Sequence, residues 1–146
     1  GNATLTIDNN GVVTSQTFNV ASASPGVFTD ANRTIVPTGS VARGQVATLY
    51  MAGAGAVNPA IATGAAPPLT TPLTSLPVPL SIAVTVAGQA ASITCAGGCF
   101  AGIPATLVGV TQINFQVPSG APVGLQQVVV VTNGVTSAPA YINVTN

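Results

Sequence analysis

Apolar and polar residues alternate along several short stretches of the chain, with the period of two that is typical of β-strands. Residues 80–86, LSIAVTV, and residues 112–117, QINFQV, show this alternation most clearly. Their apolar members share one side of the extended chain: Leu80, Ile82, Val84 and Val86 in the first, and Ile113, Phe115 and Val117 in the second. Residues 45–51, 89–95 and 126–132 are rich in β-branched side chains and predict further strands.

Turn signals separate these stretches, whereas helix signals are nearly absent. Gly or Pro interrupts most segments before an apolar stripe with a period of 3.6 residues develops. Asn10-Gly11 and Asn133-Gly134 predict tight hairpins, because both central residues of a type I′ turn need a positive φ. Ala87-Gly88 predicts another hairpin, and residues 117–124, VPSGAPVG, predict a loop. Many short strands joined by such turns predict an all-β fold, an antiparallel β-sandwich.

One long segment differs from the rest of the chain. Residues 59–79, PAIATGAAPPLTTPLTSLPVP, are rich in Pro and Thr. This composition predicts an extended, stiff segment at the surface. It is also typical of segments that carry O-linked sugar.

The two ends of the chain carry similar segments. Residues 9–20, NNGVVTSQTFNV, are nearly repeated as residues 132–144, TNGVTSAPAYINV. Residues 22–29, SASPGVFT, follow the first copy and form a natural boundary. We therefore expect a β-hairpin over residues 1–21, either a strand donor or the remnant of a preceding repeat. A sandwich domain is expected over residues 22–146.

Charge is the unusual feature of the composition. The charged side chains are those of Asp8, Asp30, Arg33 and Arg43, and the sequence contains no Lys, Glu or His. Typical globular domains carry about 25% charged residues. A chain with so few cations has little to neutralise phosphates, which excludes nucleic-acid binding and argues against binding to anionic lipid surfaces. Little repulsion remains between copies, so self-association is favoured.

Two cysteines, Cys95 and Cys99, lie in the segment TCAGGCF. An even cysteine count in a chain poor in Lys and rich in Thr suits an oxidising, extracellular setting and predicts a disulfide. Closing so short a loop stabilises a fold by about 2 kcal/mol through loop-closure entropy. A metal site is the rival interpretation, but two thiolates alone cannot fill four coordination positions.

No stretch of the sequence reaches the roughly 20 apolar residues of a membrane span. The chain begins with Gly1 and not with Met, which indicates a processed chain or an excerpt.

Several stretches together resemble a known family. The segments SPGVFT, GAGAVNP and INFQVPSGAPVG are the most specific parts of a similarity that runs from about residue 22 to residue 144. The chain resembles the Ig-like domain at the C-termini of many secreted acidobacterial proteins, which is itself similar to the IPT/TIG class of Ig-like folds. The resemblance implies an extracellular β-sandwich with a structural, spacer or sorting role and no catalytic residues. The near absence of charge and the Cys95–Cys99 insert depart from the family pattern.

Candidate catalytic chemistry is sparse. A Ser or Thr nucleophile needs a base, and the sequence offers no His, Lys or Glu for that role. The carboxylates of Asp8 and Asp30 fall in different predicted modules, so a paired-carboxylate mechanism is not favoured. Both are expected to bond backbone groups of local turns instead. Residues 53–56, GAGA, lack the lysine and following helix of a phosphate loop and predict a tight loop. We expect no enzyme activity, no cofactor and no metal.

Signals for modification and ligand binding are weak. Three sequons provide candidate glycosylation sites at Asn2, Asn32 and Asn143. Phe18 and Phe115 lie on apolar strand faces and are expected in the core. The remaining candidates for an exposed platform that binds sugar rings are Tyr50, Phe100 and Tyr141.

The N-terminal hairpin carries the main functional hypothesis. An isolated hairpin is marginal in water, so its apolar side chains need a partner: Leu5, Ile7, Val13, Phe18 and Val20. The hairpin packs on its own sandwich, belongs to a preceding domain, or adds as strands to a neighbouring copy. Head-to-tail addition builds filaments, and edges without Lys favour it.

We therefore expect a non-catalytic structural protein, extracellular or on the cell surface. It would be an Ig-like subunit of a filament or tandem stalk, assembled by β-strand addition, with itself as the main partner and without membrane insertion. The alternative is a spacer or carbohydrate-binding module of a larger secreted protein, with a polysaccharide as its partner.

Overall fold

The computed structural model describes residues 1–146, except for the side chain of Leu73. Its regular structure is almost entirely β-strand, which confirms the predicted all-β fold. The strands are β1 (Asn2–Asn9), β2 (Val12–Asn19), β3 (Gly26–Val27), β4 (Ser40–Ala42), β5 (Val46–Ala52), β6 (Val57–Asn58), β7 (Val78–Pro79), β8 (Ile82–Val86), β9 (Gln89–Ala91), β10 (Phe100–Gly102), β11 (Val110–Gln116), β12 (Gly124–Thr132), β13 (Val135–Thr136) and β14 (Ala140–Thr145). A short 3-10 helix, η1, spans Leu73–Ser75.

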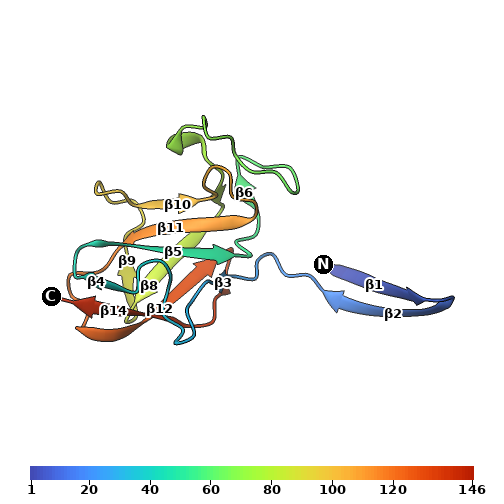
Figure 1. Cartoon of the computed structure of the whole chain (residues 1–146), viewed down its shortest axis with the longest axis horizontal. Coiled ribbons are helices and arrows are strands. Elements are labelled where there is room, and N and C mark those ends of the chain that lie inside the picture. Colours follow the sequence, from blue (N-terminus) through green and yellow to red (C-terminus); the bar gives the residue numbers. More distant parts are fainter.

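Two sheets face each other and form the predicted β-sandwich (Figure 1). One sheet has the strand order β10-β11-β5-β3, and the other has the order β4-β14-β12-β8-β9, with β13 also paired to β12. The strand pairs are antiparallel, as predicted, except that β4 runs parallel to β14. Residues before β4 follow β14 in the same direction, since the backbone N–H of Ile35 donates to the carbonyl oxygen of Tyr141 at 2.8 Å.

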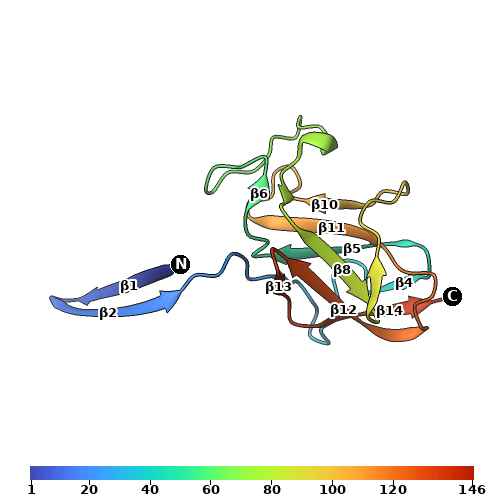
Figure 2. The same cartoon turned by 180° about the vertical axis from the view of Figure 1, so that it is seen from behind.

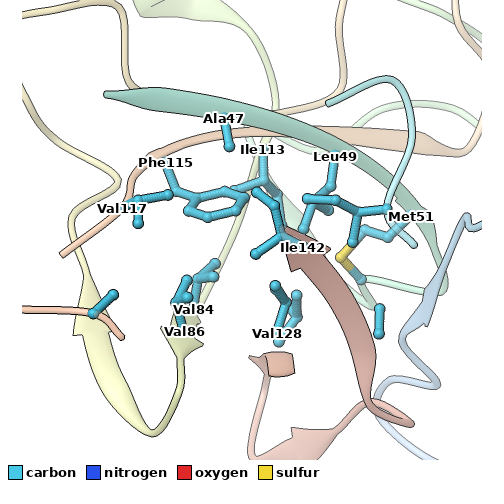
Figure 3. Packing of buried hydrophobic residues seen from close by; sticks show 14 of the residues in the cluster. Ala47, Leu49, Met51, Val84, Val86, Ile113, Phe115, Val117, Val128 and Ile142 are labelled. Atoms are coloured by element: carbon cyan, nitrogen blue, oxygen red, sulfur yellow. The ribbon is translucent and has the colours of Figure 1, made fainter. Parts of the chain in front are cut away.

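The core lies between the two sheets and is built by the predicted alternation. Val84 and Val86 of β8, and Ile113 and Phe115 of β11, are at most 2% exposed, and Val117 is fully buried. Figure 3 shows side chains from both sheets meeting in the middle: Leu49, Met51, Ile113 and Phe115 from one sheet, and Val84, Val86, Val128 and Ile142 from the other. Fully burying one such side chain contributes about 1.5–3 kcal/mol.

Glycine turns close the hairpins that the sequence predicts. Asn10-Gly11 joins β1 to β2, Ala87-Gly88 joins β8 to β9, and Asn133-Gly134 joins β12 to β13. All of these turn residues have φ values between 47° and 87°, as a type I′ turn requires. The register of these three hairpins is therefore set by local turn chemistry.

Two predicted strands are shorter in the structure. The strand predicted over residues 89–95 ends at Ala91, because Ser92 leaves β8 and forms an antiparallel bridge with Gln116 of the opposite sheet. The strand predicted over residues 80–86 begins at Ile82, and Leu80 is exposed. Other strands are longer than predicted, since β11 begins at Val110 and β12 at Gly124. The sequence thus locates the strands but not their exact ends.

The Pro- and Thr-rich segment of residues 59–79 is not extended as predicted. It contains η1 and several turns, and the pairing of β6 with β7 closes it into a long loop. Leu76 anchors this loop, since its side chain is only 4% exposed. A buried apolar anchor and a short strand pair therefore outweigh the stiffness expected from proline.

The N-terminal hairpin stands apart from the sandwich. Figures 1 and 2 show β1 and β2 projecting from one end of the molecule, joined to the sandwich by an irregular segment. All residues of β1 and β2 are exposed except Ala3, which is half-buried. The prediction of a sandwich with an additional N-terminal hairpin is thus confirmed.

The junction between the hairpin and the sandwich is tightly packed. Ala23 and Pro25 are buried, and the backbone N–H of Ser24 donates to the carbonyl oxygen of Gly53 at 2.8 Å. Gly53 has a φ of 73°, and a Cβ atom on it would overlap the carbonyl oxygen of Ser24. Residues 53–56 therefore form the predicted tight loop, and glycine is needed there because the chain entering the sandwich passes so close.

We predict that Gly53→Ala lowers the stability of the sandwich more than Gly64→Ala does. Gly64 has a similar φ of 76°, but a Cβ atom there would have nothing within 4 Å. Placing an alanine in the left-handed region lowers the free energy of unfolding of both variants by about 1–2 kcal/mol. Gly53→Ala loses roughly 1–3 kcal/mol more through steric strain. Urea unfolding measures both losses, and equal losses would contradict the close packing of this junction.

Candidate functional site

The register of the N-terminal hairpin gives it one apolar face and one polar face. Opposed residues of an antiparallel pair lie on the same face, and successive pairs alternate between faces. The apolar side chains gather on one face: Ala3, Leu5, Ile7, Val12 and Phe18. Val20 extends this set beyond β2, since its backbone N–H donates to the carbonyl oxygen of Gly1 at 2.7 Å. We call these six residues the apolar hairpin face.

The opposite face of the hairpin is lined by hydroxyl groups. Two pairs hydrogen-bond across the strands: Thr4 with Thr17 at 3.3 Å, and Thr6 with Ser15 at 2.9 Å. Val13 lies on this polar face, opposite Asp8. The sequence groups Val13 with the apolar side chains, but the structure separates it from them and places Val12 there instead. The reason is the two-residue period of the strand, which puts neighbours on opposite faces.

The apolar hairpin face is open to solvent. Its large side chains, those of Leu5, Ile7, Val12, Phe18 and Val20, are between 49% and 69% exposed. Core packing is therefore wrong as an expectation for Phe18, whereas Phe115 is fully buried as expected. Packing of the hairpin on its own sandwich is wrong as well, because the hairpin projects away from it (Figure 2). Contiguous exposed apolar patches mark interaction sites, so this face is the candidate functional site.

The two carboxylates support local turns, as expected. Asp8 Oδ1 accepts the backbone N–H of Gly11 at 2.9 Å. Asp30 Oδ1 accepts the backbone N–H groups of Asn32 at 2.9 Å and Thr34 at 2.8 Å. Asp8 lies in the hairpin and Asp30 in the sandwich, so the structure does not bring the two together for paired-carboxylate chemistry.

The three aromatic candidates do not form one platform. Tyr50 of β5 and Phe100 of β10 both belong to the β10-β11-β5-β3 sheet. Tyr141 belongs to the other sheet, where the Arg33 guanidinium lies 5.8 Å from the centre of its ring. A sugar-binding surface made of all three side chains is therefore excluded by the fold.

A groove of about 600 Å³ lies over β10 and β11. Phe100, Gln112 and Asn114 line it from the sheet, while Leu69 and Thr71 line it from the long loop. Asn114 Oδ1 accepts hydrogen bonds from Thr48 Oγ1 and Gln112 Nε2, each at 2.9 Å. The groove thus combines an aromatic ring with fixed amide groups. The sequence did not reveal it, because the long loop forms one wall and its path was not predictable.

The disulfide lies beside this groove, and the predicted pairing of Cys95 with Cys99 is confirmed. Cys99 itself lines the groove together with Gly98. The loop is held on the sheet, since Asn114 Nδ2 donates to the carbonyl oxygen of Gly98 at 3.2 Å. The disulfide therefore helps to shape one wall of the groove.

The candidate glycosylation sites lie at the surface. Asn2, Asn32 and Asn143 are exposed. The Asn143 side chain donates from Nδ2 to Ser40 Oγ at 3.2 Å, and Asn2 pairs with Asn19 in the hairpin. Their accessibility is compatible with modification, which remains a prediction.

Among the side chains that the structure describes, no three His, Cys, Asp or Glu residues gather to hold a metal. In the same described part of the chain, no helix is long and apolar enough to cross a membrane.

Comparison with known proteins places the chain in no family. Neither family models nor curated proteins give a match to this sequence. The resemblance to the Ig-like domain of secreted acidobacterial proteins therefore remains a prediction that rests on the sequence segments alone.

Proposed function

We propose that this chain is a non-catalytic extracellular structural protein, an Ig-like unit of a surface filament or tandem stalk. Neighbouring units would join through β-strand addition at residues 1–21. The observation that carries the proposal is the apolar hairpin face, which holds five large apolar side chains on a projecting two-stranded ribbon. An isolated two-stranded hairpin is marginally stable, so this ribbon needs a partner.

Composition supports the same proposal. The chain has no side-chain charge beyond Arg43, so copies repel each other little when they pack closely. The disulfide Cys95–Cys99 suits an oxidising compartment outside the cell. A structural unit needs neither a catalytic base nor a cofactor, which agrees with the local roles of Asp8 and Asp30.

We predict that the 146-residue chain self-associates through the apolar hairpin face. Sedimentation velocity should show species larger than a monomer that grow with concentration, and negative-stain electron microscopy should show their shape. The double variant Ile7→Ser/Phe18→Ser should remain monomeric, because it removes apolar area that association would bury. Val13→Ser is the matched control and should associate like the parent chain, since Val13 lies on the polar face.

Two results would contradict assembly by association between separate copies. One is a monomer at every concentration tested, and the other is association that the double variant leaves unchanged. Circular dichroism of each variant checks that the sandwich stays folded, which is expected because the hairpin projects away from it (Figure 1).

A second candidate function, polysaccharide binding, is favoured by the groove over β10 and β11. The groove joins Phe100 to the amide side chains of Gln112 and Asn114. Sugar rings present apolar faces that pack on aromatic rings and hydroxyl groups that bond to amides. In this function the chain would act as a spacer or binding module of a larger secreted protein.

We predict that, if the groove binds polysaccharide, Phe100→Ala weakens binding about tenfold by removing the aromatic contact. Affinity electrophoresis in gels that contain a panel of soluble polysaccharides measures this change. Phe28→Ala is the matched control, because Phe28 is an exposed phenylalanine that does not line the groove, whereas Phe100 is half-buried in it. Equal mobility of both variants and the parent chain in every gel would reject this function.

A further inference from the structure

The apolar hairpin face has a counterpart inside the sandwich. The second copy of the repeated segment, residues 132–144, contains the Asn133-Gly134 turn, which joins β12 to β13. Asn9 pairs with Val12 around the first turn as Thr132 pairs with Val135 around the second. Superposing the two turns makes β1 equivalent to β12, and it makes β2 equivalent to β13 and β14.

Apolar residues of β1 coincide with core positions of β12. Counting back from the superposed turns, Ile7 corresponds to Val130 and Leu5 corresponds to Val128. Both valines are fully buried in the sandwich. Thr6, on the polar face, corresponds to Val129, which is not part of the buried core. The two faces of β1 therefore match the inner and outer faces of β12.

Strand pairing extends the equivalence to Phe18. Ala3 pairs with Phe18 in the hairpin. Gln126, which corresponds to Ala3, pairs with Ile142 in the sandwich. Phe18 therefore corresponds to Ile142, which is fully buried.

The same comparison of strand pairs identifies the counterpart of Val20, at the end of the hairpin that joins the sandwich. Gly1 and Val20 exchange two backbone hydrogen bonds, at 2.7 and 2.9 Å. Gly124, which corresponds to Gly1, pairs with Val144, which is fully buried. Val20 thus corresponds to Val144, so four large side chains of the apolar hairpin face fall on core positions.

The sandwich shows what covers such a face. Figure 3 shows Val128 and Ile142 directed toward the opposite sheet, where Leu49, Ile113 and Phe115 point back at them. These residues come from β5 and β11. The covering surface carries no charge, and neither does the apolar hairpin face, so the two surfaces are electrostatically compatible.

We propose that residues 1–21 are the last strands of a second sandwich of this same type. Its equivalents of β5 and β11 cover the apolar hairpin face, and its equivalent of β8 pairs with the free edge of β1, as β8 pairs with β12. This inference rests on the proposed structural function and names the partner of the hairpin.

The partner is a sandwich that lacks its own last strands. A complete copy offers no place for the hairpin, because its own β12 and β14 already fill the position and its core is closed. The hairpin therefore belongs to a domain whose chain continues into Gly1. Of the two assemblies in the proposed function, this selects the tandem stalk over a filament of complete copies.

Four residues of the hairpin are larger than the residues they match: Leu5, Ile7, Gln16 and Phe18. Gln16 pairs with Leu5 as Ala140 pairs with Val128, so a long amide stands where the sandwich buries a methyl group. Phe18 is also larger than Ile142. The second sandwich must therefore leave more room at these four positions than the one in this chain does.

The test places residues 22–123 ahead of Gly1 of the full 146-residue chain, which supplies the missing strands of the second sandwich. Hydrogen exchange of residues 2–19, followed by mass spectrometry, reports on the hairpin. We expect exchange at least about 1000-fold slower than in the parent chain, because opening would require unfolding of a whole domain. A second fusion carries Leu5→Val, Ile7→Val, Gln16→Ala and Phe18→Ile, which removes any mismatch of size.

Two matched variants of the protected fusion separate burial from other effects. Val20→Thr puts a hydroxyl at the position of buried Val144, and it should speed hairpin exchange about 10- to 100-fold. Val13→Thr makes the same chemical change at the position of Thr136, which is exposed, and should leave exchange within about threefold.

The inference would be overturned if residues 2–19 exchanged in both fusions as fast as in the parent chain. It would also be overturned if Val20→Thr and Val13→Thr changed the exchange rate of the hairpin equally. Such a result leaves the proposed function standing if the 146-residue chain still associates through Ile7 and Phe18. Conversely, a protected hairpin in the fusions with no association of the parent chain would reject association between copies and keep the tandem domain.

Discussion

An apolar sheet face has to be covered, and this requirement organises the whole molecule. In the sandwich each sheet covers the other, and side chains such as Phe115 and Ile142 are fully buried. The N-terminal hairpin presents the same kind of face with nothing over it. The chain therefore contains one apolar sheet face that is covered and one that is not, and the proposed function rests on the uncovered face.

The scarcity of charge has different consequences in the two parts of the chain. Sheet edges usually avoid pairing with other chains by carrying Lys or by being short. The edge strands of the sandwich, β3, β4, β9 and β10, are only two or three residues long, so they present little backbone for pairing. By contrast, β1 and β2 have eight residues each. The tendency to pair with other strands is thus concentrated in the hairpin.

The sequence predicts those features that depend on local patterns. Alternation identifies the buried side of β11 at Ile113 and Phe115, and the Asn-Gly pairs identify the turns. The exposure of Phe18 was not predictable, because alternation shows which side chains share a face but not whether another sheet covers that face. The groove escaped prediction for a related reason, since Leu76 holds a loop whose path depends on tertiary packing rather than on local composition.

The position of the junction determines how successive domains would be arranged. The chain enters the sandwich beside the Asn133-Gly134 turn, where Ser22 Oγ donates to the carbonyl oxygen of Asn133 at 3.5 Å. By equivalence, the second sandwich would receive its chain beside the Asn10-Gly11 turn, which is the tip of the hairpin farthest from this sandwich (Figure 1). The C-terminus lies at the end of the sandwich opposite the hairpin. The chain would therefore enter each domain at one end and leave it at the opposite end. Domains joined in this way extend in a line, which is the geometry of a stalk.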